Sequence, residues 1–504
     1  MTVGDLLPRL SGAMAPAGRP LVDPHAMSLP VTAIADDSRR VTAGAVFVAV
    51  LGHRRDGTTF AAEAVTRGAV LVVSGSPRPL DASAPWVMVE DARLALAELA
   101  AAFHGDPSHE LSVVGVTGTN GKTTTTYLLA AIFDAAGVPC GRIGSVGYLT
   151  GGRDQVAERT TPEAPAVQAL LREMVEHGQA ACVMEVSSHA LAMRRVHQTR
   201  FSAAIFSNLT RDHLDYHADM ATYFATKQRL FEMLPPGAPA IINADDLYGQ
   251  QLAAGVERPV TYAIDRPADV TPEGVDSTLT GTTLQVCTPR GRLRIRSRLP
   301  GRLNLYNVLA AVSAAVALEL PFPAIERGVA ALEGVPGRFE VVSVPEDGVT
   351  VLVDYAHTDD ALRAMLGAAR QLCDGRIISV FGCGGDRDAA KRPLMGAVAA
   401  RLSDLIVVTS DNPRSEDPKR IIDEIRLGIE SSTAPGAGPP HLAIADRGAA
   451  IERAIQEAES GDVVVIAGKG HEAWQEIGTE RRPFDDRLVA RAVLARRRAE
   501  TRVS

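Results

Sequence analysis

The sequence predicts an α/β protein built from three domains. Its 504 residues correspond to about three domains at roughly 150 residues each. Short runs rich in valine, isoleucine and alanine alternate with helical segments, which is the pattern of parallel sheets covered by helices. A glycine-rich segment also lies between one such strand and the helix that follows it. The expected domain limits are residues 1–110, 111–340 and 341–504.

The composition is that of a globular protein, with 46% hydrophobic and 22% charged residues. The formal net charge of -8 at pH 7 argues against nucleic acid or an anionic membrane as the main partner and favours small ligands. No stretch approaches the roughly 18 uncharged apolar residues that span a bilayer, and the N-terminus lacks a basic start followed by an apolar core. We therefore expect a cytoplasmic protein that acts on small molecules. We also expect it to be a monomer.

Five cysteines form an odd, irregular set without a Cys-x-x-Cys pair. This spacing supports neither a disulfide framework nor a zinc site. We expect buried free thiols at Cys140, Cys182, Cys287, Cys373 and Cys383.

The first predicted domain contains short apolar strands separated by turn-rich segments. The strands are expected at residues 45–50, 69–74 and 86–89, and a helix over 92–103 closes the domain. This pattern predicts a small α/β domain.

The central domain begins with a strand, a glycine turn and an alanine-rich helix. Later strands alternate with helices, which predicts a parallel sheet covered on both faces. Alternating Thr, Val, Leu and Arg over 260–298 predicts antiparallel strands appended to that sheet. The first strand and helix are expected at 111–116 and 123–136, and the later strands at 181–186, 203–207 and 238–243.

The last domain follows a turn at residues 334–340 and repeats the alternation of buried strands and helices. It is predicted to be a second doubly wound α/β domain. Residues 434–440 are expected to form a loop, and the arginines at 496–498 the solvated end of a helix. The strands are expected at 349–353, 377–381, 405–409 and 463–467.

The segment Gly118-Thr119-Asn120-Gly121-Lys122-Thr123-Thr124 connects the first central strand to its helix. In that context backbone N–H groups and the helix dipole can cradle phosphates. Lys122 would neutralise the β- and γ-phosphates, and the Thr123 hydroxyl would bind Mg²⁺. The spacing departs from the common phosphate-binding loop, because Val116 stands where the first glycine would be.

Two residues on the neighbouring strands are candidate metal ligands. Glu185 ends the 181–186 strand at the edge of the sheet where ligands of open α/β sheets bind. His213 lies in the segment 208–217, which is too rich in ligand-type side chains for an ordinary connection. The alternative for Glu185 is a solvated charge on the rim of the sheet.

Lys227 falls inside an apolar helical stripe, which is unusual for a lysine. One reading is that its stem is packed while the ammonium reaches water. The other is that burial lowers its pKa, so that the neutral amine pairs with phosphate or takes up CO₂ as a carbamate that bridges metals. The stripe consists of Met220, Tyr223, Phe224, Leu230, Phe231 and Leu234.

Lysine and asparagine are scarce in this chain. Only five of the 52 basic residues are lysine, and there are only six asparagines. If the composition has drifted toward arginine, the remaining lysines should mark places where an amine is needed. The five are Lys122, Lys227, Lys391, Lys419 and Lys469.

Together these motifs resemble the Mur ligase family of ATP-dependent amide ligases, which build the peptidoglycan stem peptide. The resemblance extends from about residue 36 to residue 486. It implies a UDP-binding N-terminal domain, a central ATPase domain and a Rossmann-like C-terminal domain that brings in an amino acid. The motifs are GTNGKTT, MEVSSHAL, NLTRDHLDYH, YFATKQRLF, NADD, residues 301–307, VPGRFE, DYAH and GCGGDRD.

The resemblance also implies roles for single residues. It implies that Lys227 is carbamylated and that it surrounds two Mg²⁺ ions together with Thr123, Glu185 and His213. Besides the glycine-rich loop, the implied ATP contacts are Asn304, Arg338, Asp354 and His357. The implied contacts of the UDP-linked peptide are Ser38, His53, Arg54, Thr160, Thr161, Ser187 and Arg195.

Within the family, Asp411-Asn412-Pro413-Arg414 resembles the signature of members that add meso-diaminopimelate, with Arg392, Gly468 and Glu472 completing the amino-acid site. Diaminopimelate carries a distal carboxylate that L-lysine lacks. A guanidinium group can bind such a carboxylate through two hydrogen bonds. The resemblance therefore implies that Arg414 sets the choice of amino acid.

The implied reaction joins meso-diaminopimelate to the D-glutamate side chain of UDP-N-acetylmuramoyl-L-alanyl-D-glutamate. ATP first converts that carboxylate to an acyl phosphate, and Lys122 with two Mg²⁺ ions stabilises the developing charge. Two alternatives stay open: a folylpolyglutamate-type ligase, which would not need a UDP-binding domain, and a nucleotide-sensing switch without catalysis.

Overall fold

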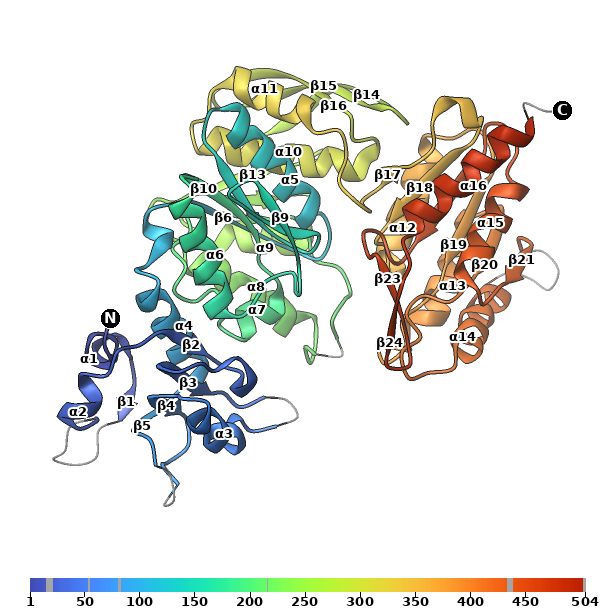
Figure 1. The fold of residues 1–504 in the computed structure, drawn as a ribbon. Helices are drawn as coiled ribbons and strands as arrows, with labels where there is room; N and C mark the ends of the chain where they lie inside the picture. Colours follow the sequence, from blue (N-terminus) through green and yellow to red (C-terminus); the bar gives the residue numbers. More distant parts are fainter. Residues whose placement is uncertain (15–20, 53–54, 80–82, 215, 433–437, 502–504) are drawn as a thin grey trace.

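The computed structural model describes residues 1–14, 21–52, 55–79, 83–214, 216–432 and 438–501. Three α/β bodies follow one another along the chain, coloured blue, cyan to yellow, and orange to red in Figure 1. Each body contains its own main sheet, as the predicted fold class requires. None of the helices in the described residues has the length and apolar character needed to cross a bilayer.

The N-terminal body is a five-stranded sheet in the order β1-β5-β4-β3-β2. Its strands are parallel except β1, which pairs antiparallel with β5. Helix α4 begins after Asp91, whose carboxylate accepts the N–H groups of Arg93 and Leu94, and it packs its apolar face on the sheet. The elements are α1 (Val3–Leu6), β1 (Ala13–Met14), α2 (Pro24–Met27), β2 (Ala33–Ala35), β3 (Ala45–Ala49), α3 (Ala61–Thr66), β4 (Leu71–Ser74), β5 (Trp86–Val89) and α4 (Ala92–Phe103).

The central body has an eight-stranded sheet in the order β13-β12-β11-β6-β10-β7-β8-β9. The strands from β13 to β7 are parallel, whereas β8 and β9 are added antiparallel. The elements of this sheet are β6 (Ser112–Thr117), α5 (Lys122–Ala135), β7 (Cys140–Ile143), β8 (Gly147–Thr150), β9 (Arg153–Val156), α6 (Ala164–Glu176), β10 (Ala181–Glu185), α7 (Ser188–Ala192), β11 (Ala203–Phe206), α8 (Met220–Glu232), β12 (Ala240–Asn243), α9 (Leu247–Gly255) and β13 (Pro259–Tyr262).

Helices cover both faces of this sheet and bury its strands. Helices α5, α10 (Gly301–Ala317) and α11 (Phe322–Ala331) cover one face, and α6, α8 and α9 cover the other. The central parallel strands β7, β10, β11 and β12 are therefore buried on both sides, as expected for a parallel sheet, whereas the edge strand β9 is exposed. Since parallel strands end at the same edge, the segments that follow β6, β10 and β11 lie together there.

The antiparallel strands predicted over 260–298 exist, but their predicted attachment to the central sheet is wrong. β14 (Thr271–Thr278), β15 (Gly281–Thr288) and β16 (Gly291–Ser297) form a separate three-stranded sheet. The residues of one face, Leu284, Val286, Leu293 and Ile295, are buried in the same core as α10 and α11. Packing of this face on helices replaces edge pairing to the central sheet, whose edge strand is β13.

The C-terminal body has a six-stranded sheet in the order β17-β18-β22-β19-β20-β21, parallel except for β17. A separate hairpin of β23 and β24 precedes the last helix. The elements are β17 (Glu340–Val341), β18 (Thr350–Asp354), α12 (Asp359–Gln371), β19 (Ile377–Phe381), α13 (Lys391–Leu402), β20 (Leu405–Val408), α14 (Pro418–Ser431), β21 (His441–Ala443), α15 (Arg447–Glu457), β22 (Val463–Ala467), β23 (Trp474–Ile477), β24 (Glu480–Pro483) and α16 (Asp486–Thr501).

Three smaller predictions have mixed outcomes. All five cysteines are free, but Cys287 and Cys373 are only partly buried, because Cys287 lies opposite the exposed Arg292 and Cys373 follows α12. Residues 438–440 form no helix or strand, and 434–437 lie outside the described residues. The arginines at 496–498 lie in α16, where Arg496 and Arg498 pair with Glu452 and Asp347 rather than only with water.

Candidate active site

The glycine-rich loop joins β6 to α5, and its backbone passes close to neighbouring side chains at two glycines. Gly118 and Gly121 have φ angles of 144° and 87°. A Cβ atom on Gly118 would lie 2.0 Å from Ser207 Oγ, and one on Gly121 would lie 2.3 Å from Asn307 Oδ1. Only glycine fits at both positions. The backbone therefore reaches the N-terminus of α5, where unpaired N–H groups can bind phosphates.

Hydrogen bonds to the segment after β11 fix the loop. Thr119 N donates to Asn208 O at 2.9 Å, and Asn120 N donates to Asn208 Oδ1 at 2.9 Å. Ser207 Oγ donates to Asn120 O at 2.6 Å. Thr124 is buried in the first turn of α5. The loop is thus held in one shape by the neighbouring strand.

Lys122 begins α5 and turns its side chain back over the loop. Its Nζ donates to Gly118 O at 3.0 Å and to Thr119 O at 2.8 Å. Burial lowers the pKa of Lys122, while Glu185 and Asp212 oppose that shift. The amine therefore lies against the backbone that would hold phosphates.

Glu185 is a buried carboxylate at the end of β10, with 1% of its surface exposed. Ser145 binds it through its N–H at 2.8 Å from Oε1 and through its hydroxyl at 3.0 and 3.1 Å from the two carboxylate oxygens. Within the described ranges, no basic side chain forms an ion pair with Glu185. A buried carboxylate without a cationic partner is costly, so this position suits a hard cation such as Mg²⁺.

Thr123 and His213 are two further predicted metal ligands. Thr123 Oγ1 is 3.3 Å from Ser145 Oγ and 3.3 Å from Arg338 Nη2. His213 has a positive φ of 54°, and its Nε2 lies 3.4 Å from Asp212 Oδ2. Burial lowers the pKa of His213 to about 4, although Asp212 opposes the shift. His213 is therefore neutral at pH 7, which is the form that binds metals.

Lys227 is buried in α8, with 1% of its surface exposed. Its Nζ donates to Gly118 O at 2.8 Å and lies 4.7 Å from the centre of the Tyr223 ring. The amine points to the glycine-rich loop and not to water, which excludes the snorkelling alternative. Burial lowers the pKa of Lys227 well below its usual value, and Lys122 adds to the shift. A neutral amine of this kind can react with CO₂.

The protein side chains alone form an incomplete metal site. In the described part of the chain no three His, Cys, Asp or Glu side chains are grouped so that they could hold an ion. Thr123, Glu185 and a carbamate on Lys227 would offer oxygen ligands, which Mg²⁺ prefers together with water, and His213 would add one nitrogen.

The predicted ATP contacts lie on both sides of the point where the chain enters the C-terminal body. Arg338 lies 4.6 Å from the centre of the Tyr355 ring and reaches Thr123. Asp354 accepts the N–H groups of Phe339 and Ala356 at 2.6 and 2.8 Å, and burial raises the pKa of its carboxyl. Two further predicted contacts are bonded locally: Asn304 Nδ2 donates to Pro300 O at 2.9 Å, and His357 Nδ1 lies 2.8 Å from Tyr355 O.

A cleft of about 610 Å³ lies between the central and C-terminal bodies. Residues 211–214 line its central side, and the loops after β18, β19, β20 and β22 line the other side together with the β23–β24 hairpin. The cleft thus joins a predicted metal ligand to most of the predicted amino-acid site. The predicted residues that line it are His213, His357, Asp411, Asn412, Arg414, Gly468 and Glu472.

Arg414 is fixed by its backbone and its side chain. It has a positive φ of 52°, and its N–H donates to Glu476 O at 3.1 Å. Its Nε donates to Glu476 Oε2 at 3.0 Å and its Nη1 to Gly385 O at 2.7 Å. In the described residues no acceptor binds Nη2, which leaves this nitrogen free to donate to a ligand in the cleft.

Arg392 and Pro413 do not line the cleft. The guanidinium group of Arg392 is 1% exposed and binds Glu416 at 2.8 and 3.0 Å and Glu424 at 2.8 Å. Pro413 is buried, and its carbonyl lies against Gly385. Arg392 therefore lies behind the loop that holds Arg414.

Most of the predicted contacts of the UDP-linked peptide that the structure describes form one cluster, and one of them lies apart. Thr161 Oγ1 donates to Glu185 O at 2.8 Å and accepts from Ser187 N, while Arg195 donates to Thr161 O at 3.0 Å. Thr160, next to Thr161, is partly buried. Ser38 lies in the N-terminal body and binds Glu63 at 2.9 Å. His53 and Arg54 lie outside the described residues.

Several residues of the site were not predicted from the sequence. Ser145 binds Glu185, and Trp474, Glu476 and Arg481 of the β23–β24 hairpin line the cleft. The hairpin gives no apolar alternation that would identify its strands. Lys391 lines the cleft as well, and the scarcity of lysine in the sequence was the one signal that could have identified it.

Comparison with known proteins agrees with this geometry. Family models described as Mur ligase family, catalytic domain, Mur ligase middle domain, and Mur ligase, glutamate ligase domain match residues 30–104, 116–315 and 337–470. A UDP-N-acetylmuramoyl-L-alanyl-D-glutamate--2,6-diaminopimelate ligase of Solibacter usitatus is 47% identical over 480 residues, covering 94% of this chain and 96% of the relative.

Solved structures give the same result. A structure of a UDP-N-acetylmuramoyl-L-alanyl-D-glutamate--2,6-diaminopimelate ligase has a TM-score of 0.65 and 32% identity, covering 93% of this chain and 95% of the other. MurF ligase from Thermotoga maritima in complex with ADP shares the fold, with a TM-score of 0.63, 18% identity, and coverage of 94% and 99%. This chain therefore belongs to the Mur ligase family.

Proposed function

We propose that this chain joins meso-2,6-diaminopimelate to the D-glutamate side-chain carboxylate of UDP-N-acetylmuramoyl-L-alanyl-D-glutamate at the expense of ATP. The relatives with that name match nearly the whole chain. The observation that carries the proposal is the free Nη2 of Arg414 at the wall of the cleft, beside Asn412 and Glu472. The proposal includes the domain limits 1–110, 111–340 and 341–504 and a monomeric enzyme in the cytoplasm.

In the first step, an oxygen of the D-glutamate carboxylate attacks the γ-phosphorus of ATP, and ADP leaves. Lys122 lies where it can contact the transferring phosphoryl group. Thr123, Glu185, His213 and a carbamate on Lys227 would hold Mg²⁺, which supplies positive charge to the phosphoryl oxygens. The product is an acyl phosphate on the UDP-linked dipeptide.

In the second step, the amine of diaminopimelate attacks the acyl carbon. The tetrahedral intermediate loses inorganic phosphate and a proton, and an amide bond remains. The cleft between the central and C-terminal bodies orients the amine, since its walls carry both His213 and Glu472. The carboxylate of Glu472 suits an ammonium group of the amino acid, and Arg414 suits its distal carboxylate.

The two alternatives are less well supported. A folylpolyglutamate-type ligase would not need the N-terminal body that matches the Mur ligase family model at residues 30–104. A nucleotide switch without catalysis would not need Glu185 and Lys227 buried beside the glycine-rich loop.

The specificity of Arg414 tests the proposal. Arg414→Ala should reduce kcat/KM for diaminopimelate about ten- to a hundredfold, because one charge-assisted hydrogen bond is lost. The value for L-lysine should change little, so the ratio of the two efficiencies should fall. Arg401→Ala, at an exposed position of α13, is the matched control. An unchanged ratio in Arg414→Ala would remove Arg414 from the specificity site.

A further inference from the structure

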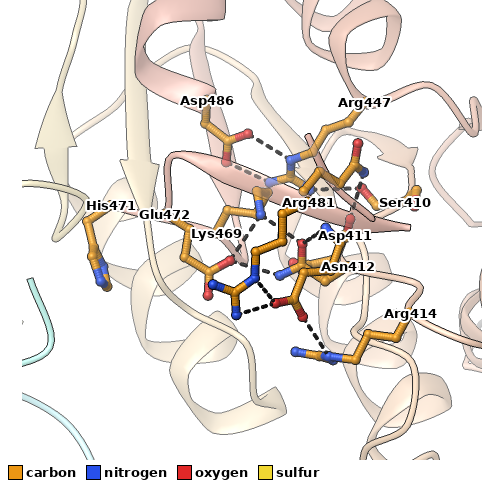
Figure 2. A network of polar contacts seen from close by, with 12 residues as sticks. Ser410, Asp411, Asn412, Arg414, Arg447, Lys469, His471, Glu472, Arg481 and Asp486 are labelled. Atoms are coloured by element: carbon orange, nitrogen blue, oxygen red, sulfur yellow. Dashed lines mark hydrogen bonds and ion pairs between the residues drawn. The ribbon is translucent and has the colours of Figure 1, made fainter. Parts of the chain in front are cut away.

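A completely buried lysine lies directly beneath the proposed amino-acid site (Figure 2). Lys469 follows Gly468 at the carboxyl end of β22, and none of its surface is exposed. Its Nζ donates to Asn412 Oδ1 at 3.0 Å and to Glu472 Oε2 at 3.0 Å. Both partners line the cleft, whereas Lys469 does not. The lysine therefore contacts the site from behind.

Lys469, Asn412 and Glu472 form a closed ring of hydrogen bonds. Asn412 Nδ2 donates to Glu472 Oε2 at 2.8 Å, the same oxygen that Lys469 binds. Asn412 Oδ1 also accepts the N–H of Glu476 at 3.0 Å, which ties the ring to the β23–β24 hairpin. Two donors thus occupy Oε2 of Glu472, while no donor in the described residues binds Oε1.

This arrangement assigns the two oxygens of Glu472 to different tasks. Oε2 is held by the protein, and the carboxylate cannot rotate without breaking two hydrogen bonds. Oε1 is then the oxygen available to a cationic group in the cleft. Ammonium groups of an amino acid are such ligands, and a fixed carboxylate binds them without losing further side-chain freedom.

A compact amine suits this position better than a guanidinium group, because it donates to two acceptors there. An ammonium group is compact and can donate to two acceptors in different directions, whereas a guanidinium group is planar and larger. The surroundings are closed to solvent, since none of the surface of Lys469 is exposed. Almost all basic residues of this chain are arginine, and the fit of a compact amine explains why this position has a lysine.

We propose that Lys469 is a positioning residue for the amino-acid substrate. It fixes Glu472 and Asn412, so that Glu472 Oε1 can bind an ammonium group of the substrate. The inference rests on the proposed function and deepens it. Lys469 touches neither the substrate nor the reacting atoms. Its loss should weaken the binding of the amino acid and leave the ATP and UDP-dipeptide sites as they are.

The test compares Lys469→Met and Lys469→Arg with Lys419→Met. Lys419 is an exposed lysine of α14 without a side-chain bond in the described residues, so its variant controls for loss of a lysine. Both Lys469 variants should raise the KM for diaminopimelate about ten- to a hundredfold, because charge-assisted hydrogen bonds to Glu472 are lost or misdirected. The KM values for ATP and UDP-dipeptide should stay within about twofold of wild type.

A second readout separates positioning from loss of fold. Acyl phosphate formation from ATP and UDP-dipeptide needs no amino acid, so its single-turnover rate should be unchanged in Lys469→Met. Combining Lys469→Met with Glu472→Gln should add little to the effect of Glu472→Gln alone, since the lysine acts through that carboxylate.

Two outcomes would overturn the inference. One is a wild-type KM for diaminopimelate in Lys469→Met. The other is an equal rise in the KM values for all three substrates together with slower formation of the acyl phosphate. Failure of the proposed function would look different, because the wild-type enzyme itself would then form no ADP in response to UDP-dipeptide and diaminopimelate.

Discussion

Lys227 combines complete burial with a contact to the glycine-rich loop, and this combination gives its amine unusual chemistry. Burial and the nearby Lys122 lower the pKa of Lys227 well below its usual value, so the amine is neutral more often than an exposed lysine. A neutral amine can add CO₂ and become an anionic carbamate. The side chain would then carry a negative charge, which suits Mg²⁺ beside Glu185.

Replacing Lys227 tests this carbamate. Lys227→Ala should lose most activity, and added formate or acetate should restore part of it by supplying the missing carboxylate oxygens. The measurement is the rate of ADP release with and without the added acid, with Lys419→Ala as the control variant. Full activity of Lys227→Ala in bicarbonate-free buffer would contradict the carbamate.

The two candidate metal ligands should affect chemistry and not UDP-substrate binding. Glu185→Ala and His213→Ala should slow Mg²⁺-dependent acyl phosphate formation by at least about a hundredfold, since the metal acts on charge that develops in the transition state. Calorimetry of UDP-dipeptide binding without ATP should give near wild-type affinity. A large loss of that affinity in either variant would show that the residue contacts the UDP substrate instead.

Single residues were predictable from the sequence where their chemistry conflicted with their surroundings. Lys227 was recognisable as a lysine in an apolar stripe, and the scarcity of lysine also pointed to Lys469. The partners of these residues were not predictable. That Arg392 binds Glu416 and Glu424 behind the cleft depends on how α13 and α14 pack, which no local pattern encodes.

Among the elements, the buried parallel strands were the most predictable. Strands β19 and β22 have the expected limits, because each is a run of five mostly β-branched or aromatic residues bounded by turn residues, which is typical of a buried strand. The β23–β24 hairpin was missed because its sequence, WQEI and ERRP, lacks apolar alternation. Its position is set by contacts of Arg414 and Asn412 with Glu476, which join residues far apart in the chain.

A buried ion pair ties α15 and α16 to the loops of the proposed amino-acid site (Figure 2). Arg447 and Asp486 are fully buried and bind each other through two hydrogen bonds of 2.7 Å. Arg447 also donates to Ser410 O at 3.3 Å and Ala467 O at 2.9 Å, the residues just before Asp411 and Gly468. The pair therefore holds the two loops side by side.

Breaking this pair should destabilise the C-terminal body. Arg447→Met should lower the free energy of unfolding by about 3 to 5 kcal/mol, because Asp486 is left buried without its partner. Urea unfolding followed by fluorescence would measure the loss. The double variant Arg447→Met/Asp486→Leu should lose less than Arg447→Met alone. A loss under about 1 kcal/mol in the single variant would contradict this role.

At the scale of the whole molecule, His471 joins the C-terminal body to the candidate metal site. Its Nε2 lies 2.9 Å from Ser145 O, and its Nδ1 lies 3.2 Å from Arg338 Nη1. Arginine can only donate and a carbonyl can only accept, so Nδ1 accepts and Nε2 carries the proton. Ser145 also binds Glu185, so one residue links the two bodies at the candidate metal site.

This contact predicts a pH dependence. Burial lowers the pKa of His471 from its ordinary 6.5 to about 3. Between those values the unfolded chain binds a proton that the folded chain does not, so stability falls as the pH falls from about 6.5 toward 3. His471→Gln should flatten this dependence when melting temperatures are compared between pH 7.5 and 5. Equal slopes in the two proteins would contradict a neutral, buried His471.

The most direct test of the central claim is ADP release by the wild-type enzyme with different combinations of substrates. We expect continuous release over many turnovers to require UDP-N-acetylmuramoyl-L-alanyl-D-glutamate and an amino acid together, because the first step alone gives at most about one ADP per enzyme. We also expect kcat/KM for meso-diaminopimelate to exceed that for L-lysine by at least about tenfold, the value of one charge-assisted hydrogen bond to Arg414. ADP release without the UDP-dipeptide, or equal efficiency with the two amino acids, would contradict the account.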